Sequence, residues 1–175
     1  MGLISRKPAV LLLEDGSVFK GNSLGKIGSA TGEICYYTGM TGYQEIYTDP
    51  SYFGQIIINT SSHIGNYGTV DEEQESKFPQ INVVIINEYS EVYSRSNSEE
   101  SLEDYFIKNN TVAIFDIDTR KLVKHIRDKG AMNAIISSDI LDVEKLKVLL
   151  SKVPPMKNLE LSSKVTTKEE YTYGD

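Results

Sequence analysis

The sequence has a single cysteine, Cys35, among its 175 residues. One cysteine excludes an internal disulfide and a metal site of the CxxC type, and it indicates a reducing, cytoplasmic compartment. Long apolar runs are also missing, because the run near the N-terminus covers only residues 9–13. That run is too short for the apolar part of a signal peptide or for a membrane span, so we expect no membrane partner.

Positive charge is scarce as well. The chain has 18 Lys and Arg against 25 Asp and Glu, which gives a formal net charge of −7. An acidic surface repels phosphate backbones, so a nucleic-acid partner is disfavoured, whereas a protein partner with a basic face is compatible with it. Neither a P-loop nor a GxGxxG motif after a strand is found, so we expect no nucleotide site of those types and no cofactor.

The sequence does contain a series of short strands, which alternate with helices in its later part. The dipeptide Asp15–Gly16 between two apolar runs predicts a β-hairpin at residues 9–20. Further strands are predicted at residues 33–38, 55–60, 81–86, 111–115 and 132–136, and helices at 42–47, 98–108, 119–129 and 142–152. This order predicts an α/β or α+β layered domain with helices mainly on one side.

Local signals mark three of the helix boundaries. Thr41 and Gln44 have the spacing of a capping box at the start of the first helix. Asp118 is suited to the N-cap of the third helix, and Gly130 is suited to the position just after its end.

The apolar pattern becomes weaker after the last predicted helix. We therefore predict one domain over residues 1–153 and a linker or tail over residues 154–175.

Few side chains are suited to catalysis. Cys35 is the one possible thiol nucleophile, but it lacks the flanking glycines of a nucleophile elbow, so we interpret it as a packed core residue. His125 lies on a predicted helix between Lys124 and Arg127, and we interpret it as a surface residue. His63 opens a glycine-bounded loop, where the alternatives are a structural hydrogen-bonding role and an exposed general base.

Asp116 and Asp118 alternate at the end of a predicted strand, and two interpretations are open for them. One is a metal site or an acid/base pair. The other is that Asp118 caps the following helix and the acidic residues pair with Arg120 and Lys121. The residue pattern favours the second interpretation.

Residues 49–52 (DPSY) predict a turn, with proline at the second position of a type I turn. From this pattern alone the turn is conformational, and a binding role for Ser51 is the less favoured alternative. Residues 40–45 mix apolar and polar side chains in a short predicted helix, which suits a partner contact or a loop lid.

Several segments, taken in order, resemble one family. They are LLEDG (12–16), GE (32–33), MTGYQEI (40–46), TDPSY (48–52), HIGN (63–66), DIDTRKL (116–122) and RDKGA (127–131). Together they resemble the N-terminal domain of the small subunit of glutamine-dependent carbamoyl-phosphate synthetase, over about residues 9–137. MTGYQEI, TDPSY and DIDTRKL are specific in combination, whereas any one of them alone is not.

The resemblance implies a fold, two partners and one site residue. In the family, a layered β/β/α domain of the swivelling type is joined to a class I glutaminase domain that releases ammonia from glutamine. The large subunit uses this ammonia with bicarbonate and ATP to make carbamoyl phosphate for pyrimidine and arginine biosynthesis. The expected partners are therefore the large subunit and the glutaminase domain of the same subunit. As the serine of TDPSY, Ser51 is expected to reach the glutamine site.

The chain also departs from the family pattern. It contains no glycine-flanked cysteine elbow and no downstream His-x-Glu, and Cys35 does not match the glutaminase nucleophile. We therefore expect this polypeptide alone neither to hydrolyse glutamine nor to bind ATP, and we expect no catalytic residue and no metal site in it. The alternatives left open are a free-standing non-catalytic binding or regulatory module with the same fold, and a small enzyme built around His63 and Asp116.

Overall fold

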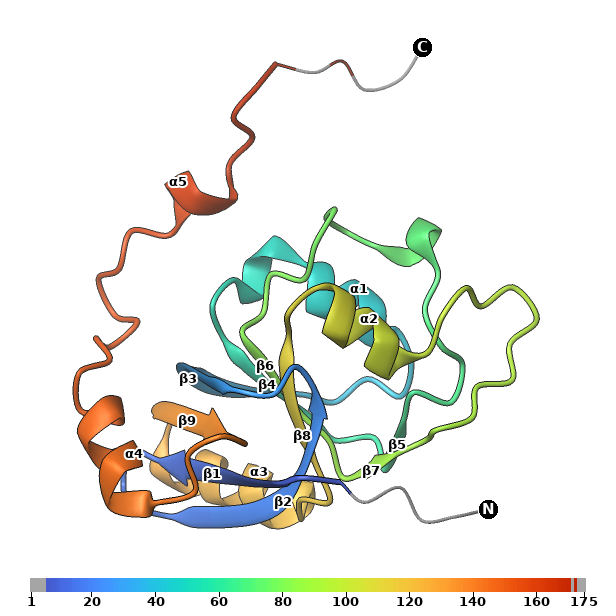
Figure 1. Ribbon diagram of the computed structural model, residues 1–175. Coiled ribbons are helices and arrows are strands. Elements are labelled where there is room, and N and C mark those ends of the chain that lie inside the picture. The colour runs from blue at the N-terminus through green and yellow to red at the C-terminus, as the bar shows by residue number, and fades with distance from the viewer. Residues whose placement is uncertain (1–5, 171, 173–175) are drawn as a thin grey trace.

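The computed structural model describes residues 6–170 and 172, and its centre is a closed seven-stranded β-barrel (Figure 1). The strands follow one another around the barrel in the order β1-β2-β8-β6-β4-β3-β9. Their bounds are β1 (Pro8–Leu13), β2 (Val18–Gly25), β3 (Ser29–Tyr37), β4 (Ile56–Asn59), β6 (Val83–Ile85), β8 (Val112–Phe115) and β9 (Asn133–Ser137). The mixed α/β class predicted from the sequence is confirmed.

The barrel has a parallel half and an antiparallel half. Strands β3, β4, β6 and β8 pair parallel to one another, and helical or looped crossovers join them. Strands β1, β2 and β9 pair antiparallel with one another and with the parallel half. A separate two-stranded sheet joins β5 (His63–Ile64) to β7 (Glu88–Tyr89).

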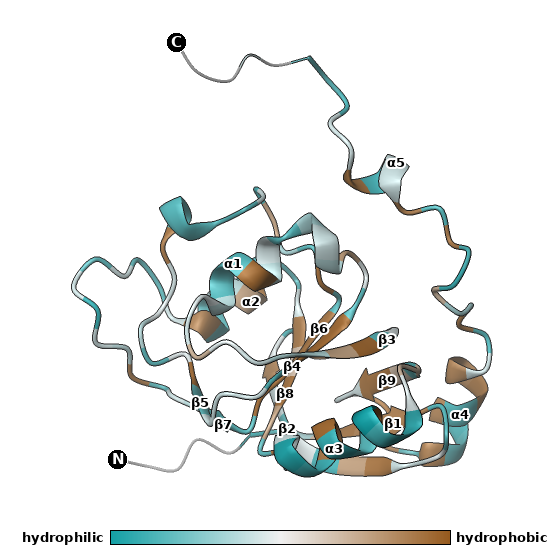
Figure 2. Cartoon of the chain, turned by 180° about the vertical axis from the view of Figure 1, so that it is seen from behind, coloured by the Kyte–Doolittle hydropathy of each residue, from teal (hydrophilic) through white to brown (hydrophobic). Residues whose placement is uncertain are grey.

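The barrel interior is filled by the side chains that alternate inward along each strand. Figure 2 shows the strands as largely hydrophobic. The inward residues are Ala9, Leu11, Leu13, Ile34, Ile56, Ile58, Val83, Ile85, Val112, Ile114, Ala134 and Ile136. Leu122 and Ile126 from α3 (Thr119–Lys129) complete this cluster. The helix is therefore anchored by its apolar stripe and turns its polar face outward.

The helices cover different parts of the barrel, so the expectation of helices mainly on one side is wrong. Helices α1 (Tyr43–Thr48) and α2 (Leu102–Lys108) share a core with outward residues of β4, β6 and β8. Helix α4 (Val143–Leu150) packs on outward residues of β1 and β9. The physical reason is that the closed barrel has apolar side chains on the outside of both its parallel and its antiparallel half, and helices must bury both sets.

The predicted hairpin and the signals of the third helix are confirmed. The N–H of Leu13 donates to the Ser17 carbonyl at 2.9 Å across the tight turn. The carboxylate of Asp118 accepts a hydrogen bond from the N–H of Lys121 at 2.9 Å, which makes it the N-cap of α3. Gly130 follows the helix with φ 96°, a conformation that glycine adopts at low cost.

The predicted capping box of the first helix is wrong. The N-cap of α1 is Gly42, with φ 79°, and no side chain caps the helix from the usual position. The Gln44 side chain is fully buried, and its carbonyl oxygen accepts a hydrogen bond from the N–H of Val70 at 2.9 Å. The hydroxyl of Tyr67, distant in sequence, accepts instead from the Gly42 N–H at 2.9 Å. A tertiary contact has therefore replaced the local signal of Thr41.

The described part of the segment after α4 passes beside the barrel and then extends beyond it, and the short helix α5 (Ser162–Val165) is its one helix among the described residues (Figure 1). The division into a domain over residues 1–153 and a linker or tail over 154–175 stays a prediction. Among the described residues, no helix combines the length and the apolar character needed to cross a bilayer.

Candidate functional site

Ser51 lies in an exposed turn between α1 and β4. The turn is the 3-10 helix η1 (Pro50–Tyr52), and the Asp49 carboxylate accepts a hydrogen bond from the Ser51 N–H at 2.8 Å. Pro50 has no N–H and a fixed φ, so the chain leaves the helical path at Thr48. The Ser51 side chain is exposed and makes no side-chain hydrogen bond to the described residues. Its hydroxyl is therefore available to a ligand.

Aromatic contacts hold the helix that precedes this turn. The rings of Tyr43 and Tyr67 are stacked with centroids 4.1 Å apart, and the Tyr67 hydroxyl accepts from the Tyr43 N–H at 3.1 Å. Tyr47 is fully buried, and its hydroxyl accepts a hydrogen bond from the Asn59 side chain of β4 at 2.7 Å. Helix α1 is thus fixed at its start and near its end, and this fixes the turn that carries Ser51.

The far side of the turn lies directly against strand β3. Gly54 has φ 75°, and its N–H donates to the Gln80 carbonyl at 2.9 Å. A Cβ atom on Gly32 of β3 would lie 2.4 Å from the Gly54 carbonyl oxygen, well inside van der Waals contact. Glycine at position 32 is therefore what allows the turn to approach the barrel this closely. This gives a structural reason for the GE segment of the sequence pattern.

A groove of about 270 Å³ lies beside this turn. Phe53 and Gly54 line one part of it, and residues of the segment after α4, among them Met156 and Leu161, line another. Ser51 is not one of the lining residues. The turn and the outgoing chain thus share one face of the domain, although the serine itself lies outside the groove.

Cys35 is half-buried and packs against the hydrophobic cluster under α1 and α2. Burial, together with the nearby Glu33 carboxylate, raises the pKa of its thiol to about 12. The thiol donates a hydrogen bond to the Gln55 side chain at 3.3 Å. At neutral pH the group is a protonated thiol and a poor nucleophile. The interpretation of Cys35 as a packed residue is confirmed.

His63 is exposed in strand β5, where its Nε2 lies 3.0 Å from the Glu88 carboxylate of β7. Its Nδ1 lies 3.1 Å from the Ser62 hydroxyl. The ion-pair partner is therefore Glu88, which the sequence analysis did not identify, and not Asp116. Both side chains of the pair are more than half exposed, so the pair links β5 to β7 at the surface and contributes little stability.

Asp116 and Asp118 serve separate structural purposes. Asp116 has φ 64°, and its carboxylate accepts from the Asn22 amide at 3.2 Å. Asp118 is the N-cap of α3. No cluster of metal-ligating side chains occurs among residues 6–170 and 172. Among the described residues His63 contacts Glu88 and Asp116 contacts Asn22, so the contacts support neither an acid/base pair of Asp116 and Asp118 nor a small enzyme built around His63 and Asp116.

His125 lies on the surface helix α3 as predicted, but its side chain is half-buried against the β1–β2 hairpin. Its Nε2 lies 2.6 Å from the Asp15 carboxylate and 3.4 Å from the Ser17 hydroxyl. Burial alone would raise the pKa of Asp15, but hydrogen bonds from Ser17 and from His125 outweigh it and lower the pKa. Because Asp15 and Ser17 meet the same ring nitrogen, the three groups cannot relay a proton as a triad does. The contact fastens α3 to the β1–β2 hairpin.

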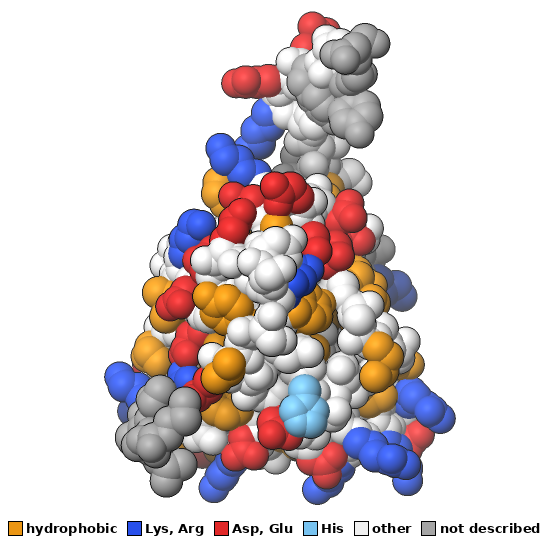
Figure 3. Space-filling view, turned by 90° about the vertical axis from the view of Figure 1, so that its right-hand side faces the viewer, with side chains coloured by type: hydrophobic (Ala, Val, Ile, Leu, Met, Phe, Trp, Pro, Cys, Tyr) orange, Lys and Arg blue, Asp and Glu red, His pale blue; other side chains and the backbone are white. Residues whose placement is uncertain are grey.

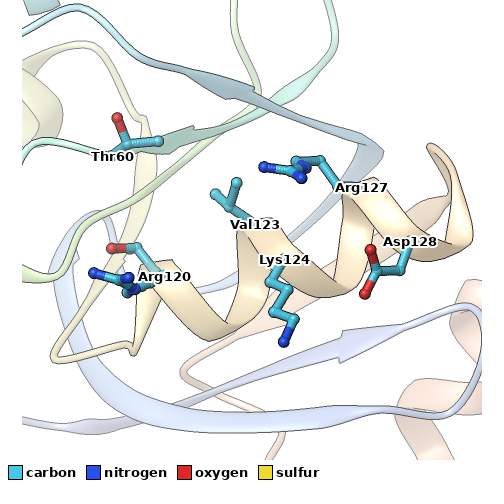
Figure 4. A pocket seen from close by; sticks show the side chains of 7 residues that line it. Thr60, Arg120, Val123, Lys124, Arg127 and Asp128 are labelled. Carbon is cyan, nitrogen blue, oxygen red and sulfur yellow. The ribbon is translucent and has the colours of Figure 1, made fainter.

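A feature that the sequence pattern did not predict is a cleft along α3, shown in Figure 4. It has a volume of about 440 Å³, and we call it the α3 cleft. It is lined by Thr60, Thr119, Arg120, Val123, Lys124, Arg127 and Asp128. The available signal was the spacing of the basic residues at i, i+4 and i+7, which places them on one helix face.

Charge is distributed unevenly over the rest of the surface. The 3-10 helix η2 (Asp71–Glu73) is entirely acidic. Acidic side chains gather over the upper part of the face shown in Figure 3. The net charge of −7 is therefore not a uniform property of the surface, because the α3 cleft is basic.

The chain matches the family model described as carbamoyl-phosphate synthase small chain, CPSase domain, over residues 11–136. This range contains the whole barrel except the first residues of β1 and the last residue of β9. The turn of Ser51, the His63 segment and helix α3 all lie inside it.

Curated relatives give the same result. The chain is 47% identical over 165 residues to the carbamoyl phosphate synthase small chain of Chlorobaculum tepidum, which covers 94% of this chain and 45% of the relative. The protein of the same name from Aquifex aeolicus is 46% identical, with 97% of this chain and 46% of the relative covered. That from Vibrio vulnificus is 45% identical, with 95% and 44% covered. The chain thus spans less than half the length of these relatives.

Proposed function

This chain belongs to the family of the carbamoyl-phosphate synthase small chain, and from that membership we propose that it is the structural and interface domain of that subunit. In this role it supports glutamine hydrolysis and the delivery of ammonia to the large subunit for carbamoyl phosphate synthesis. The observation that carries the proposal is the family match over residues 11–136. The protonated, unreactive thiol of Cys35 is also consistent with a structural and not a catalytic role.

We assign the barrel to the swivelling type of β/β/α domain. The antiparallel strands β1, β2 and β9 would be one layer, and the parallel strands β3, β4, β6 and β8 the second. Helices α1 and α2, which pack on the parallel half, would be the third. In this layering helix α1 and the Ser51 turn lie in the outer layer, where a neighbouring domain could contact them.

In the proposed complex, the Ser51 hydroxyl contacts glutamine bound to the glutaminase domain of the same subunit. The exposure of Ser51 and the rigid attachment of α1 support this role, because a ligand contact needs both access and a fixed position. We propose a cytoplasmic location for the complex, and the single cysteine supports it because one cysteine cannot form an internal disulfide.

The partner proposal is tested by pull-down. The chain is immobilised and mixed with the carbamoyl-phosphate synthase large chain of the same organism, and separately with the glutaminase domain of its subunit. Retention of either partner at micromolar concentration is the expected result. Retention of neither would overturn the interface role and leave a free-standing module as the better account. Glutamine turnover by the chain alone that disappears in Cys35→Ala would overturn its non-catalytic role.

The site proposal is tested by Ser51→Ala in the rebuilt complex. Loss of one neutral hydrogen bond to substrate is worth about 1 kcal/mol, so KM for glutamine should rise roughly two- to tenfold with little change in kcat. The matched control is Ser96→Ala, which removes another exposed hydroxyl without a hydrogen-bond partner among the described residues. If both variants keep the unaltered KM, Ser51 has no substrate contact, while the docking role still stands.

A further inference from the structure

Helix α3 concentrates positive charge in a chain that is acidic overall. Its 11 residues include five basic and one acidic side chain, whereas the whole chain has a net charge of −7. The charged residues of the helix are Arg120, Lys121, Lys124, Arg127, Asp128 and Lys129, and all are exposed. The inward face is occupied by Leu122 and Ile126, and of these charged groups Lys121 contacts the barrel, with its ammonium 5.9 Å from the centre of the Phe19 ring.

The two arginines of α3 differ from the others in the chain. Arg6 and Arg95 form ion pairs with glutamates, the Arg95 pair at 2.5 Å. Within the described part of the chain, Arg120 and Arg127 form neither an ion pair nor a side-chain hydrogen bond. A guanidinium presents a planar set of donors that fits carboxylates closely. Two such groups without internal partners on one face are available for an external anion.

The stability of the helix does not explain all of these cations. Arg127 and Lys129 lie in the last turn, where positive charge is favoured by the helix dipole. Arg120 and Lys121 lie in the first turn, where the same dipole opposes positive charge. The helix dipole therefore accounts for the positive charge of Arg127 and Lys129 but not for that of Arg120 and Lys121.

The cations are spread over the cleft and do not surround one point. Arg120, Lys124 and Arg127 line the α3 cleft; in Figure 4 the charged end of Arg120 lies toward the start of the helix, and those of Arg127 and Lys124 lie farther along it, on opposite sides in this view. With a rise of about 1.5 Å per residue, the Cα atoms of the two arginines are roughly 10 Å apart along the axis. This spacing fits several carboxylates in a row better than one small anion.

We propose that the α3 cleft is a docking site for a short acidic segment of a protein partner. Carboxylates of the segment would contact Arg120, Lys124 and Arg127, and Thr60 also lines the cleft. Asp128 also lines the cleft and would disfavour a carboxylate placed next to it. The inference concerns a different surface from the Ser51 turn and does not depend on the proposed function.

Nucleic acid fits this surface less well than an acidic protein segment does. Helix α3 is roughly 16 Å long, so a nucleic-acid strand of ordinary length would continue past it. It would then lie against a surface whose charge outside α3 is strongly negative. A short acidic segment avoids this repulsion because it ends within the basic region.

The test uses fluorescence anisotropy with a labelled 12-residue oligoglutamate peptide at low ionic strength. The decisive variant is R120E/R127E. The control is K145E/K152E, which makes the same charge change with exposed lysines on and just after α4. Thermal unfolding verifies that each variant is folded, and R120Q/R127Q replaces the first variant if it is not. The expected result is peptide binding by the unaltered chain, a dissociation constant raised at least tenfold in R120E/R127E, and a change under threefold in K145E/K152E.

Four results would overturn the proposal. The unaltered chain could fail to bind the peptide, or the two double variants could weaken binding equally, which would indicate an effect of net charge alone. Full displacement of the peptide by millimolar inorganic phosphate would indicate a site for a single small anion. Tighter binding of a labelled 12-nucleotide single-stranded RNA, lost in R120E/R127E, would indicate a nucleic-acid surface.

Discussion

The hydroxyl oxygen of Tyr67 lies 3.1 Å from the backbone nitrogen of Tyr43, and the two rings are stacked with centroids 4.1 Å apart. One side chain thus provides both the cap of α1 and part of its packing. This pair determines where α1 begins, and therefore where the Ser51 turn lies at its other end.

Tyr67→Phe should destabilise the domain while keeping the stacked ring. The substitution removes the acceptor of two backbone N–H groups, a loss expected to cost about 1–2 kcal/mol. Urea unfolding followed by circular dichroism measures the change in the free energy of unfolding. Tyr93→Phe, at an exposed tyrosine, is the matched control and should be neutral. Equal stability of both variants would show that the Tyr67 hydroxyl is not a cap of any consequence.

Asp139 should contribute stability that depends on pH. Hydrogen bonds from the Ser29 hydroxyl at 2.6 Å and the Ser137 hydroxyl at 2.9 Å lower the pKa of its carboxyl group. A lowered folded-state pKa means that the ionised form stabilises the fold. This contribution is fully present above the unfolded pKa of about 3.9 and is lost as the pH falls through the folded pKa.

Asp139→Asn should therefore be less stable than the unaltered chain at pH 7, and the difference should disappear as the pH falls through the lowered pKa of Asp139. Urea midpoints measured between pH 2 and pH 7 test this. The same substitution in the S29A/S137A background, where both donors are gone, should show a much smaller difference at every pH. A difference that is constant with pH would contradict the assigned hydrogen bonds.

Local signals in the sequence predicted much of this fold. Asp15–Gly16 marked the first hairpin because a short loop with glycine at its left-handed position determines its own geometry; the loop has three residues, 14–16, with Gly16 at φ 88°. Asp118 and Gly130 marked the ends of α3 because capping depends on residues next to the helix. The capping of α1 could not be predicted in this way, since the acceptor is Tyr67 and is brought there by the fold.

Closure of the barrel was also beyond the sequence pattern. It depends on β3 pairing with β9, strands that lie about a hundred positions apart, and alternating hydrophobicity does not identify such partners. The Ser51 turn was found through its motif, and its geometry agrees with an accessible hydroxyl. The α3 cleft was missed because each basic residue was considered separately, whereas the cleft depends on Thr60 facing the helix.

Cys35 should react slowly with thiol reagents in the folded chain. Its pKa of about 12 leaves very little thiolate at pH 8, whereas an unperturbed cysteine with a pKa near 8.5 is substantially ionised there. Modification by a chromogenic disulfide reagent at pH 8 should be at least ~100-fold slower in buffer than in 8 M urea. Comparable rates in both solvents would mean that Cys35 is neither buried nor protonated as the structure indicates.

Gly32→Ala should disturb the Ser51 turn from the barrel side. The added Cβ would lie 2.4 Å from the Gly54 carbonyl oxygen, and because that atom belongs to the backbone, either β3 or the turn must shift. Overpacking of this kind typically costs about 1–3 kcal/mol. Amide hydrogen exchange can locate the shift, since the N–H of Gly54 is bonded to the Gln80 carbonyl and should exchange faster in the variant.

Gly16→Ala provides the comparison for this experiment. Gly16 has φ 88° and nothing within 4 Å of an added Cβ, so its replacement costs only backbone strain, about 1 kcal/mol, in the first hairpin. The free energy of unfolding of the Gly16→Ala variant should fall, and the exchange rate of the Gly54 N–H should rise only as much as this loss of overall stability predicts. If Gly32→Ala likewise leaves Gly54 exchanging in line with global stability, the close approach of β3 does not hold the turn. Faster exchange at Gly54 in Gly32→Ala alone would tie the position of Ser51 to a glycine nineteen residues before it.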